Sequence, residues 1–113
     1  MHEMALCEGV IEIIEAEAKR QNFTRVRGVC LEIGALSHVA PEAMRFCFDA
    51  VSRGTIAERA RFEVIDVPGA AWCMHCAKTV TIGQRLNPCP HCGSYQLQVT
   101  AGEDLRVKEL EVE

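Results

Sequence analysis

Four cysteines in the second half of the sequence form two Cys-x-x-Cys pairs, Cys73 with Cys76 and Cys89 with Cys92, which residues 77–88 separate. Each pair can present two thiolates from one tight turn, and two such turns that face each other complete a tetrahedron around Zn(II). The spacing therefore predicts a zinc-ribbon site. An iron–sulfur cluster and a redox-active dithiol are the alternatives that this pattern leaves open.

The predicted zinc site is structural, because four protein ligands leave no coordination position for a reacting water. Residues 70–99 contain few large apolar side chains, so the folding of this segment should depend on the metal. His75 and His91 lie inside the two cysteine pairs. We interpret them as exposed turn residues, and the alternative is that one of them replaces or tunes a thiolate.

A second group of potential metal donors stands at the start of the sequence, Met1-His2-Glu3. The amine of Met1, the backbone nitrogen of His2 and the imidazole of His2 can close two adjacent chelate rings. Ni(II) and Cu(II) favour nitrogen ligands in tetragonal or square-planar geometry, and Glu3 can add a fourth donor. A histidine near a chain end is more often solvated than metal-bound, so these three residues alone do not predict a nickel site. Other features of the sequence must support it.

Two helices are expected to position these donors. In residues 3–20 the apolar side chains recur at spacings of three and four with glutamates between them, which predicts an amphipathic helix that begins almost at the first residue. Pro41 opens a second helix that Gly54 would end. Its expected core-facing residues are Ala43, Phe46, Cys47, Ala50 and Val51.

Three segments are predicted to be strands: residues 25–34, 61–67 and 105–112. In the last of these, Leu105 and Val107 lie in one alternation phase and Leu110 and Val112 in the other, so a bulge near Lys108 or Glu109 is expected. The predicted fold class is α+β, a small three-stranded sheet with two helices plus an inserted zinc-ribbon module. We expect residues 1–68 and 100–113 to form a nickel-binding α/β domain and residues 69–99 a zinc-binding domain.

Composition narrows the class of protein. Of the 113 residues, 49% are hydrophobic and 25% charged, which is typical of a globular protein. The net charge of -4 and the lack of a basic cluster argue against nucleic acid as the main partner. No apolar run approaches the roughly 20 residues that cross a bilayer, and no export signal is visible, so we expect a cytoplasmic protein without a membrane partner. In that compartment seven cysteines favour metal binding over disulfides.

The remaining cysteines and one histidine are not expected to bind a metal. Cys7, Cys30 and Cys47 fall on the first helix, the first strand and the second helix, where free cysteine packs as a small hydrophobic residue. His38 lies in the connector before the second helix. It is expected to be solvated, with an additional nickel ligand as the alternative.

Several segments together resemble one known family. With the amino-terminal MHEMALC, the segment GVCLEIGALSHVAPEAMRFCFD, the two cysteine pairs and the closing DLRVKELEVE, the sequence resembles the HypA/HybF hydrogenase maturation family over essentially the whole chain. The resemblance implies delivery of nickel to the [NiFe]-hydrogenase large subunit together with a HypB-type GTPase, and to urease where that enzyme exists. It assigns nickel to His2, an influence on nickel binding to Glu3, and zinc to Cys73, Cys76, Cys89 and Cys92. Family members occur as monomers or dimers, so a homodimer remains open.

Other functions fit the sequence less well. A zinc-ribbon module that binds nucleic acid or another protein is the main alternative, but nucleic-acid modules usually carry a basic stripe or stacking aromatics, and only 5% of these residues are aromatic. A thiol oxidoreductase would need a thiolate at a helix start beside a βαβ pattern. The sequence contains no nucleophile with its base, no phosphate-binding loop and no open catalytic metal site, so we do not expect an enzyme.

Overall fold

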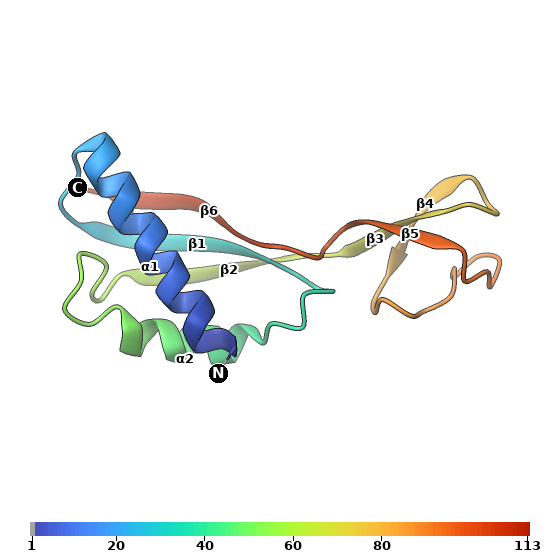
Figure 1. The fold of residues 1–113 in the computed structure, drawn as a ribbon, viewed down its shortest axis with the longest axis horizontal. Helices are drawn as coiled ribbons and strands as arrows, with labels where there is room; N and C mark the ends of the chain where they lie inside the picture. Colours follow the sequence, from blue (N-terminus) through green and yellow to red (C-terminus); the bar gives the residue numbers. More distant parts are fainter. Residues whose placement is uncertain (1) are drawn as a thin grey trace. The chain divides into compact units, whose positions relative to one another are not determined.

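The fold is given by a computed structural model that describes residues 2–113. Met1, the predicted amine donor, lies outside the described residues. The helices and strands, labelled in Figure 1, are α1 (His2–Gln21), β1 (Val26–Gly34), α2 (Pro41–Val51), β2 (Arg61–Val67), β3 (Gly69–Cys73), β4 (Lys78–Ile82), β5 (Leu97–Ala101) and β6 (Leu105–Val112). All the predicted elements are present within one or two residues of their expected bounds.

The first sheet has the strand order β2-β1-β6, and α1 crosses one of its faces (Figure 1). The apolar stripe predicted for α1 is the face it buries, through Cys7, Val10, Ile11 and Ile14. Burial of such a stripe supplies most of a helix's stability in a folded protein. The predicted three-stranded sheet with two helices is therefore confirmed.

The orientation of α2 differs from the sequence prediction. Its buried residues are Met44, Cys47 and Phe48, whereas Phe46 is 77% exposed. Phe48 stacks on Phe62 of β2 with 4.8 Å between the ring centroids. Because Phe46 and Phe48 are both large and apolar, helical spacing alone fitted either face, and the prediction that placed Phe46 in the core was wrong.

The inserted segment forms a second three-stranded sheet with the order β4-β3-β5. All its pairings are antiparallel, and Trp72 of β3 faces Thr79 on one side and Gln98 on the other. One face of this sheet packs on a small core that also contains Leu36, from the segment after β1. The α+β class with a module inserted before the last strand is confirmed, and the module contains this sheet in addition to the cysteine turns.

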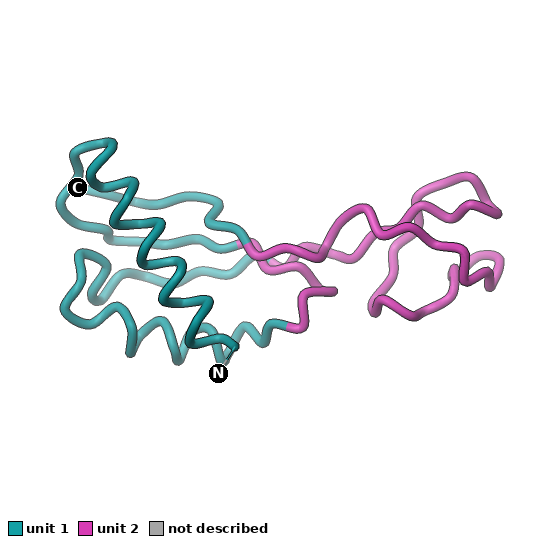
Figure 2. The backbone as a smooth tube through the Cα atoms, in the orientation of Figure 1, with its two compact units in different colours: residues 1–31, 39–65, 106–113 teal, residues 32–38, 66–105 magenta. Residues whose placement is uncertain are grey.

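The chain forms two compact units (Figure 2). The first contains residues 1–31, 39–65 and 106–113, and the second contains residues 32–38 and 66–105. The second unit is thus longer than the 69–99 segment that we predicted to bind zinc. The segment after β1 belongs to it because Ala35 donates a backbone hydrogen bond to Val67 and Leu36 donates one to Gly102, at 2.9 and 2.8 Å.

The last strand shows only part of the phase change that its sequence indicates, because Leu110 is half-buried but Val112 is 42% exposed. Leu105, Val107 and Leu110 are half-buried, while the charged residues between and after them are exposed. The core-facing positions are therefore two residues apart at first and then three. None of the described helices is both long and apolar enough to cross a membrane.

Candidate metal centre

The four predicted zinc ligands come together in the second unit. The sulfur atoms of Cys73, Cys76, Cys89 and Cys92 all lie within 4.8 Å of one another. Two of the separations are 3.6 Å, between Cys73 and Cys92, and 3.9 Å, between Cys76 and Cys89. Zn–S bonds of about 2.3 Å in a tetrahedron place sulfur atoms about 3.8 Å apart, so the donor set fits Zn(II).

Two similar turns present the thiols. In the first, Ala77 donates a backbone hydrogen bond to the Cys73 carbonyl at 2.8 Å and adopts a φ of 54°. In the second, Gly93 donates the equivalent bond to the Cys89 carbonyl at 2.9 Å and has a φ of 77°. Glycine adopts this left-handed conformation without strain, which explains its place directly after the second cysteine pair.

Backbone N–H groups point at two of the sulfur atoms. Cys76 donates to the Cys73 sulfur at 3.3 Å, and His91 donates to the Cys89 sulfur at 3.4 Å. Burial opposes ionisation of Cys89, but the N–H groups of Cys92 and His91 outweigh it and lower the pKa of this thiol to about 6. Cys76 is the opposite case, because the Cys92 thiol, burial and the other sulfurs raise its pKa to about 12.

The site lies at one end of the small core of the second unit. Cys73 and Cys89 are buried together with Leu36, Val80 and Ile82, whereas Cys92 is exposed. All four donors come from the protein, and this arrangement is typical of a structural metal site. Leu36 is a contributor that sequence reasoning missed. The glycine just before the Ala35–Leu36 pair was the one available signal, since a glycine at a strand end often marks close backbone approach.

The other candidate ligands are not gathered around this centre. The side chains of His75 and His91 are exposed, as expected for turn residues, and His38 is also exposed, with a left-handed φ of 61°. Within residues 2–113, the four cysteines are the only group of three or more histidine, cysteine or carboxylate side chains close enough to share a metal ion. Cys7, Cys30 and Cys47 are at most 8% exposed, which confirms their predicted core positions.

The predicted nickel donors His2 and Glu3 form the beginning of α1. The side chain of His2 is exposed and that of Glu3 is half-buried. One turn further along the helix, Cys7 is completely buried and its thiol approaches the carbonyl oxygen of Met44 on α2 at 3.4 Å. The start of α1 is therefore attached to the core of the first unit.

Together, the fold and the four-thiol cluster define a small α+β protein with one group of cysteines that could hold a metal ion among its described residues. A family model described as "Hydrogenase/urease nickel incorporation, metallochaperone, hypA" matches residues 1–112. The chain belongs to this HypA family of nickel metallochaperones.

Individual relatives are similar in sequence to this chain over the whole length of both proteins. "Hydrogenase maturation factor HypA" from Rhodopseudomonas palustris strain BisA53 is 74% identical, and "Hydrogenase maturation factor HypA 2" from Bradyrhizobium diazoefficiens is 64% identical, each over 100% of both chains. The fold is similar to the solution structure of the Ni metallochaperone HypA from Helicobacter pylori, with a TM-score of 0.72 and 20% identity over 97% of this chain and 96% of that one. The hydrogenase-maturation family suggested by the sequence motifs is confirmed.

Proposed function

We propose that this chain binds Ni(II) at its amino terminus and delivers it for the maturation of a [NiFe]-hydrogenase, while Zn(II) on the four cysteines holds the second unit together. The observation that carries the nickel site is the exposed imidazole of His2 at the first described position of α1, beside Glu3. The amine of Met1 and the backbone nitrogen of His2 would complete a nitrogen-rich donor set of the kind that Ni(II) prefers.

The position of these donors on a helix favours a defined site. Cys7 and Val10 are buried, so the helix that carries His2 is fixed in the first unit. Donors on an ordered element lose less conformational freedom on binding than donors on a free tail. The imidazole of His2 nevertheless remains accessible to a partner, which suits a site that must also release its ion.

Release requires that the partner weaken the bond between the protein and Ni(II). Amine and imidazole donors must be deprotonated to bind, so protonation opposes binding. Movement of the terminus when a partner docks would act in the same direction by disfavouring the binding-competent conformation. The proposed partners are a HypB-type GTPase and the large subunit of the hydrogenase, encountered in the cytoplasm, with urease as a further recipient where it is present.

The proposed zinc role is structural. The core of the second unit consists of a few small or medium-sized side chains around Cys73 and Cys89. Structural zinc supplies apparent binding free energies of about 10–16 kcal/mol in finger peptides, more than such a core can provide. Zinc would therefore remain bound while nickel is transferred.

Nickel titration of the untagged protein, with zinc content measured in parallel, tests the proposal. We expect one Ni(II) per chain, at least tenfold weaker binding in His2→Ala, and similar weakening when extra residues precede Met1. His38→Ala is the matched control, because it removes an exposed imidazole from the other unit and should leave nickel affinity unchanged. Equal nickel binding by all four proteins, each with one zinc, would exclude the terminal site.

A further inference from the structure

Three sulfur-bearing side chains meet in the core of the first unit, where α1 packs against α2 (Figure 1). They are Cys7 of α1 and Met44 and Cys47 of α2, and each is at most 1% exposed. The Cys7 sulfur lies 3.8 Å from the Met44 sulfur and 3.4 Å from the Met44 carbonyl oxygen. Met44 and Cys47 are one helical turn apart, so their side chains share the face that α2 buries.

The Cys47 thiol completes a cluster with this sulfur pair. Burial raises the pKa of Cys7, and the nearby Cys47 thiol adds to the rise, because two thiolates at short range repel each other. Both cysteines are free thiols. We call Cys7, Met44 and Cys47 the sulfur cluster. Sequence reasoning missed it because Cys7 and Met44 are 37 residues apart and because a methionine rarely marks a metal site.

The donor atoms of the sulfur cluster suit a soft metal ion. Metal–sulfur bonds of about 2.3 Å hold sulfur atoms that share an ion about 4 Å apart, close to the separation of the Cys7 and Met44 sulfurs. Thiolate and thioether sulfur favour Cu(I), which accepts a small number of such ligands. Zn(II) at a structural site takes four ligands, and the cluster offers three. Ni(II) favours nitrogen donors, which are not part of it.

The charge of Cu(I) also suits a buried site. Net charge is costly to place in a protein core. When Cu(I) binds, one thiol gives its proton to the solvent, and the thiolate that forms cancels the single positive charge of the ion. The second thiol and the thioether of Met44 then bind as neutral sulfur donors.

An ion can reach the sulfur cluster from the start of α1. Cys7 lies in the second turn of that helix, which begins at His2 in the described part of the chain. Helix ends open locally at a much lower cost in free energy than the centre of a core. The cluster can therefore take up an ion while the rest of the first unit stays folded.

We propose that the sulfur cluster is a Cu(I) site, distinct from the four zinc cysteines and from the proposed nickel donors. Its three ligands all lie in the first unit, whereas the four cysteines of the candidate metal centre lie in the second. A bound ion would join α1 to α2 through Cys7 on one side and Met44 and Cys47 on the other.

Anaerobic titration of the zinc-loaded full chain tests this site, with Cu(I) supplied as its coloured bicinchoninate complex and zinc measured in parallel. We expect the native chain to take one Cu(I) from the competitor and to keep its zinc. Cys7→Ala and Cys47→Ala should each bind Cu(I) at least tenfold more weakly. Cys30→Ala is the matched control, because it removes a buried thiol from β1 and should leave copper affinity unchanged.

Met44→Leu tests the cluster even where a cysteine variant folds poorly, because it conserves the side-chain volume and removes the sulfur. Its Cu(I) affinity should fall at least threefold while its circular dichroism stays native. His2→Ala should bind Cu(I) normally, so the result does not depend on the nickel proposal.

Three results would overturn the Cu(I) site. The first is a native chain that takes no Cu(I) from the competitor. The second is copper that enters only as zinc leaves, since that copper would occupy the four zinc cysteines. The third is native copper affinity in Met44→Leu or in either cysteine variant, because the proposed site needs all three sulfur atoms.

Discussion

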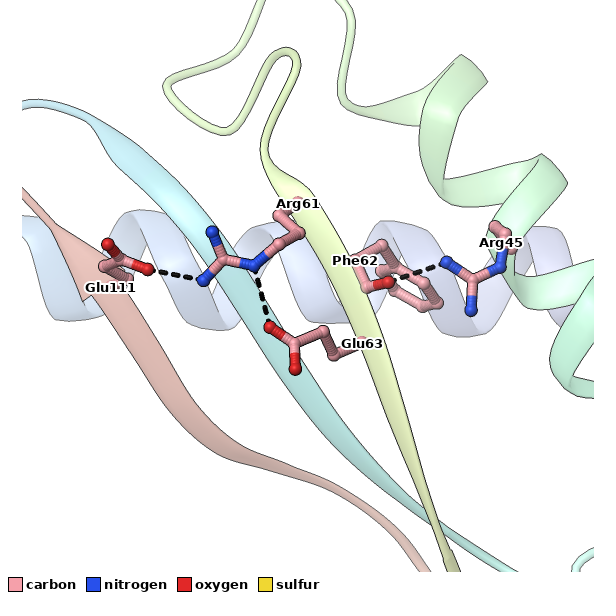
Figure 3. Close-up of polar contacts among 5 residues, drawn as sticks. All are labelled: Arg45, Arg61, Phe62, Glu63 and Glu111. Atoms are coloured by element: carbon pink, nitrogen blue, oxygen red, sulfur yellow. Dashed lines mark hydrogen bonds and ion pairs between the residues drawn. The ribbon is translucent and has the colours of Figure 1, made fainter.

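The guanidinium of Arg61 on β2 reaches across the central strand β1 to the carboxylate of Glu111 on β6, with 2.5 Å between Nη2 and Oε2 (Figure 3). The same guanidinium contacts Glu63 at 2.7 Å. This is possible because the residue beneath it on β1 is Gly28, where an added Cβ would lie 2.9 Å from Arg61 Nη2. The sheet face opposite α1 is therefore a solvated, charged face.

Two glycines in β1 should respond very differently to alanine. In Gly28→Ala the flexible ends of Arg61 and, to a smaller extent, Glu111 must move, and pairs between exposed charges contribute little to stability. In Gly34→Ala the new Cβ would lie 2.1 Å from the backbone carbonyl oxygen of Gly102, which cannot move without disturbing the strands on both sides. We expect Gly28→Ala to change the free energy of unfolding by less than about 1 kcal/mol and Gly34→Ala to lower it by about 1–3 kcal/mol or more.

Urea denaturation of both variants with zinc bound measures the difference. Gly9→Ala on α1 is the control, because an added Cβ there would contact nothing within 4 Å. The close approach of Gly34 to Gly102 would be refuted if Gly34→Ala were as stable as the native chain.

The two phenylalanines of α2 provide a second matched pair. Phe48 is 2% exposed and stacks on Phe62, whereas Phe46 is 77% exposed. Truncation of a buried phenylalanine removes apolar burial and leaves a cavity, so Phe48→Ala should lower the free energy of unfolding by about 3–5 kcal/mol. Phe46→Ala should change it by no more than about 0.5 kcal/mol. A larger loss in Phe46→Ala than in Phe48→Ala in urea denaturation would mean that α2 packs through the face predicted from its sequence.

This pair shows where sequence reasoning reached its limit. The bounds of α1, α2 and the three strands of the first sheet follow from local signals, namely apolar spacing, Pro41 and the alternation in β1. The rotation of α2 does not, because it depends on which residues the rest of the chain presents to it. Phe62 and Cys7 lie far from α2 in the sequence, and their contacts with Phe48 and Met44 decide the buried face.

The metal centre could likewise be predicted only in part from the sequence. The four cysteines were predictable because tetrahedral thiolate coordination imposes a short, recognisable spacing. The sheet that carries them was not predicted, because β3, β4 and β5 are each only five residues long, which gives a weak strand signal. The contribution of residues 32–38 was missed for another reason. These residues are held by backbone hydrogen bonds such as that from Leu36 to Gly102. Almost any residue type can form such bonds, so the sequence does not indicate them.

Removal of zinc should unfold the second unit and leave the first folded. The first unit has its own core, with Ile14, Leu31 and Phe48 at most 2% exposed, whereas the second depends on the small cluster around its thiols. After chelation of zinc from the native chain, we expect far-ultraviolet circular dichroism to retain the helical signal of α1 and α2. Amide resonances of residues 69–101 should lose their dispersion.

Cysteine variants distinguish the effect of losing zinc from the effect of losing any one thiol. Cys73→Ser should abolish stoichiometric zinc and reproduce the spectrum of the chelated protein. Cys30→Ala, which removes a buried thiol from β1, should retain one zinc per chain. Well-dispersed resonances from residues 69–101 in the zinc-free protein would contradict a metal-dependent fold.

Burial of Cys7 should make the protein less stable in alkali. Burial, with smaller contributions from the nearby Cys47 and Glu3, raises the pKa of the Cys7 thiol from 9.0 to about 11. Between these values the unfolded chain loses the proton while the folded chain keeps it, so the free energy of unfolding must fall as pH rises from about 9 to 11. Below pH 9 both states hold the proton and the contribution is complete.

Urea denaturation of the native chain and of Cys7→Ala across this pH range isolates the effect. Every other titratable group is present in both proteins, so the difference between the two curves reports Cys7 alone. The variant should be less stable at pH 8, because a buried side chain has been shortened, and the gap should narrow towards pH 11. Parallel curves would show that the Cys7 thiol ionises as readily in the folded chain as in the unfolded one, and that the contact between α1 and α2 at Met44 is looser than the 3.4 Å approach indicates.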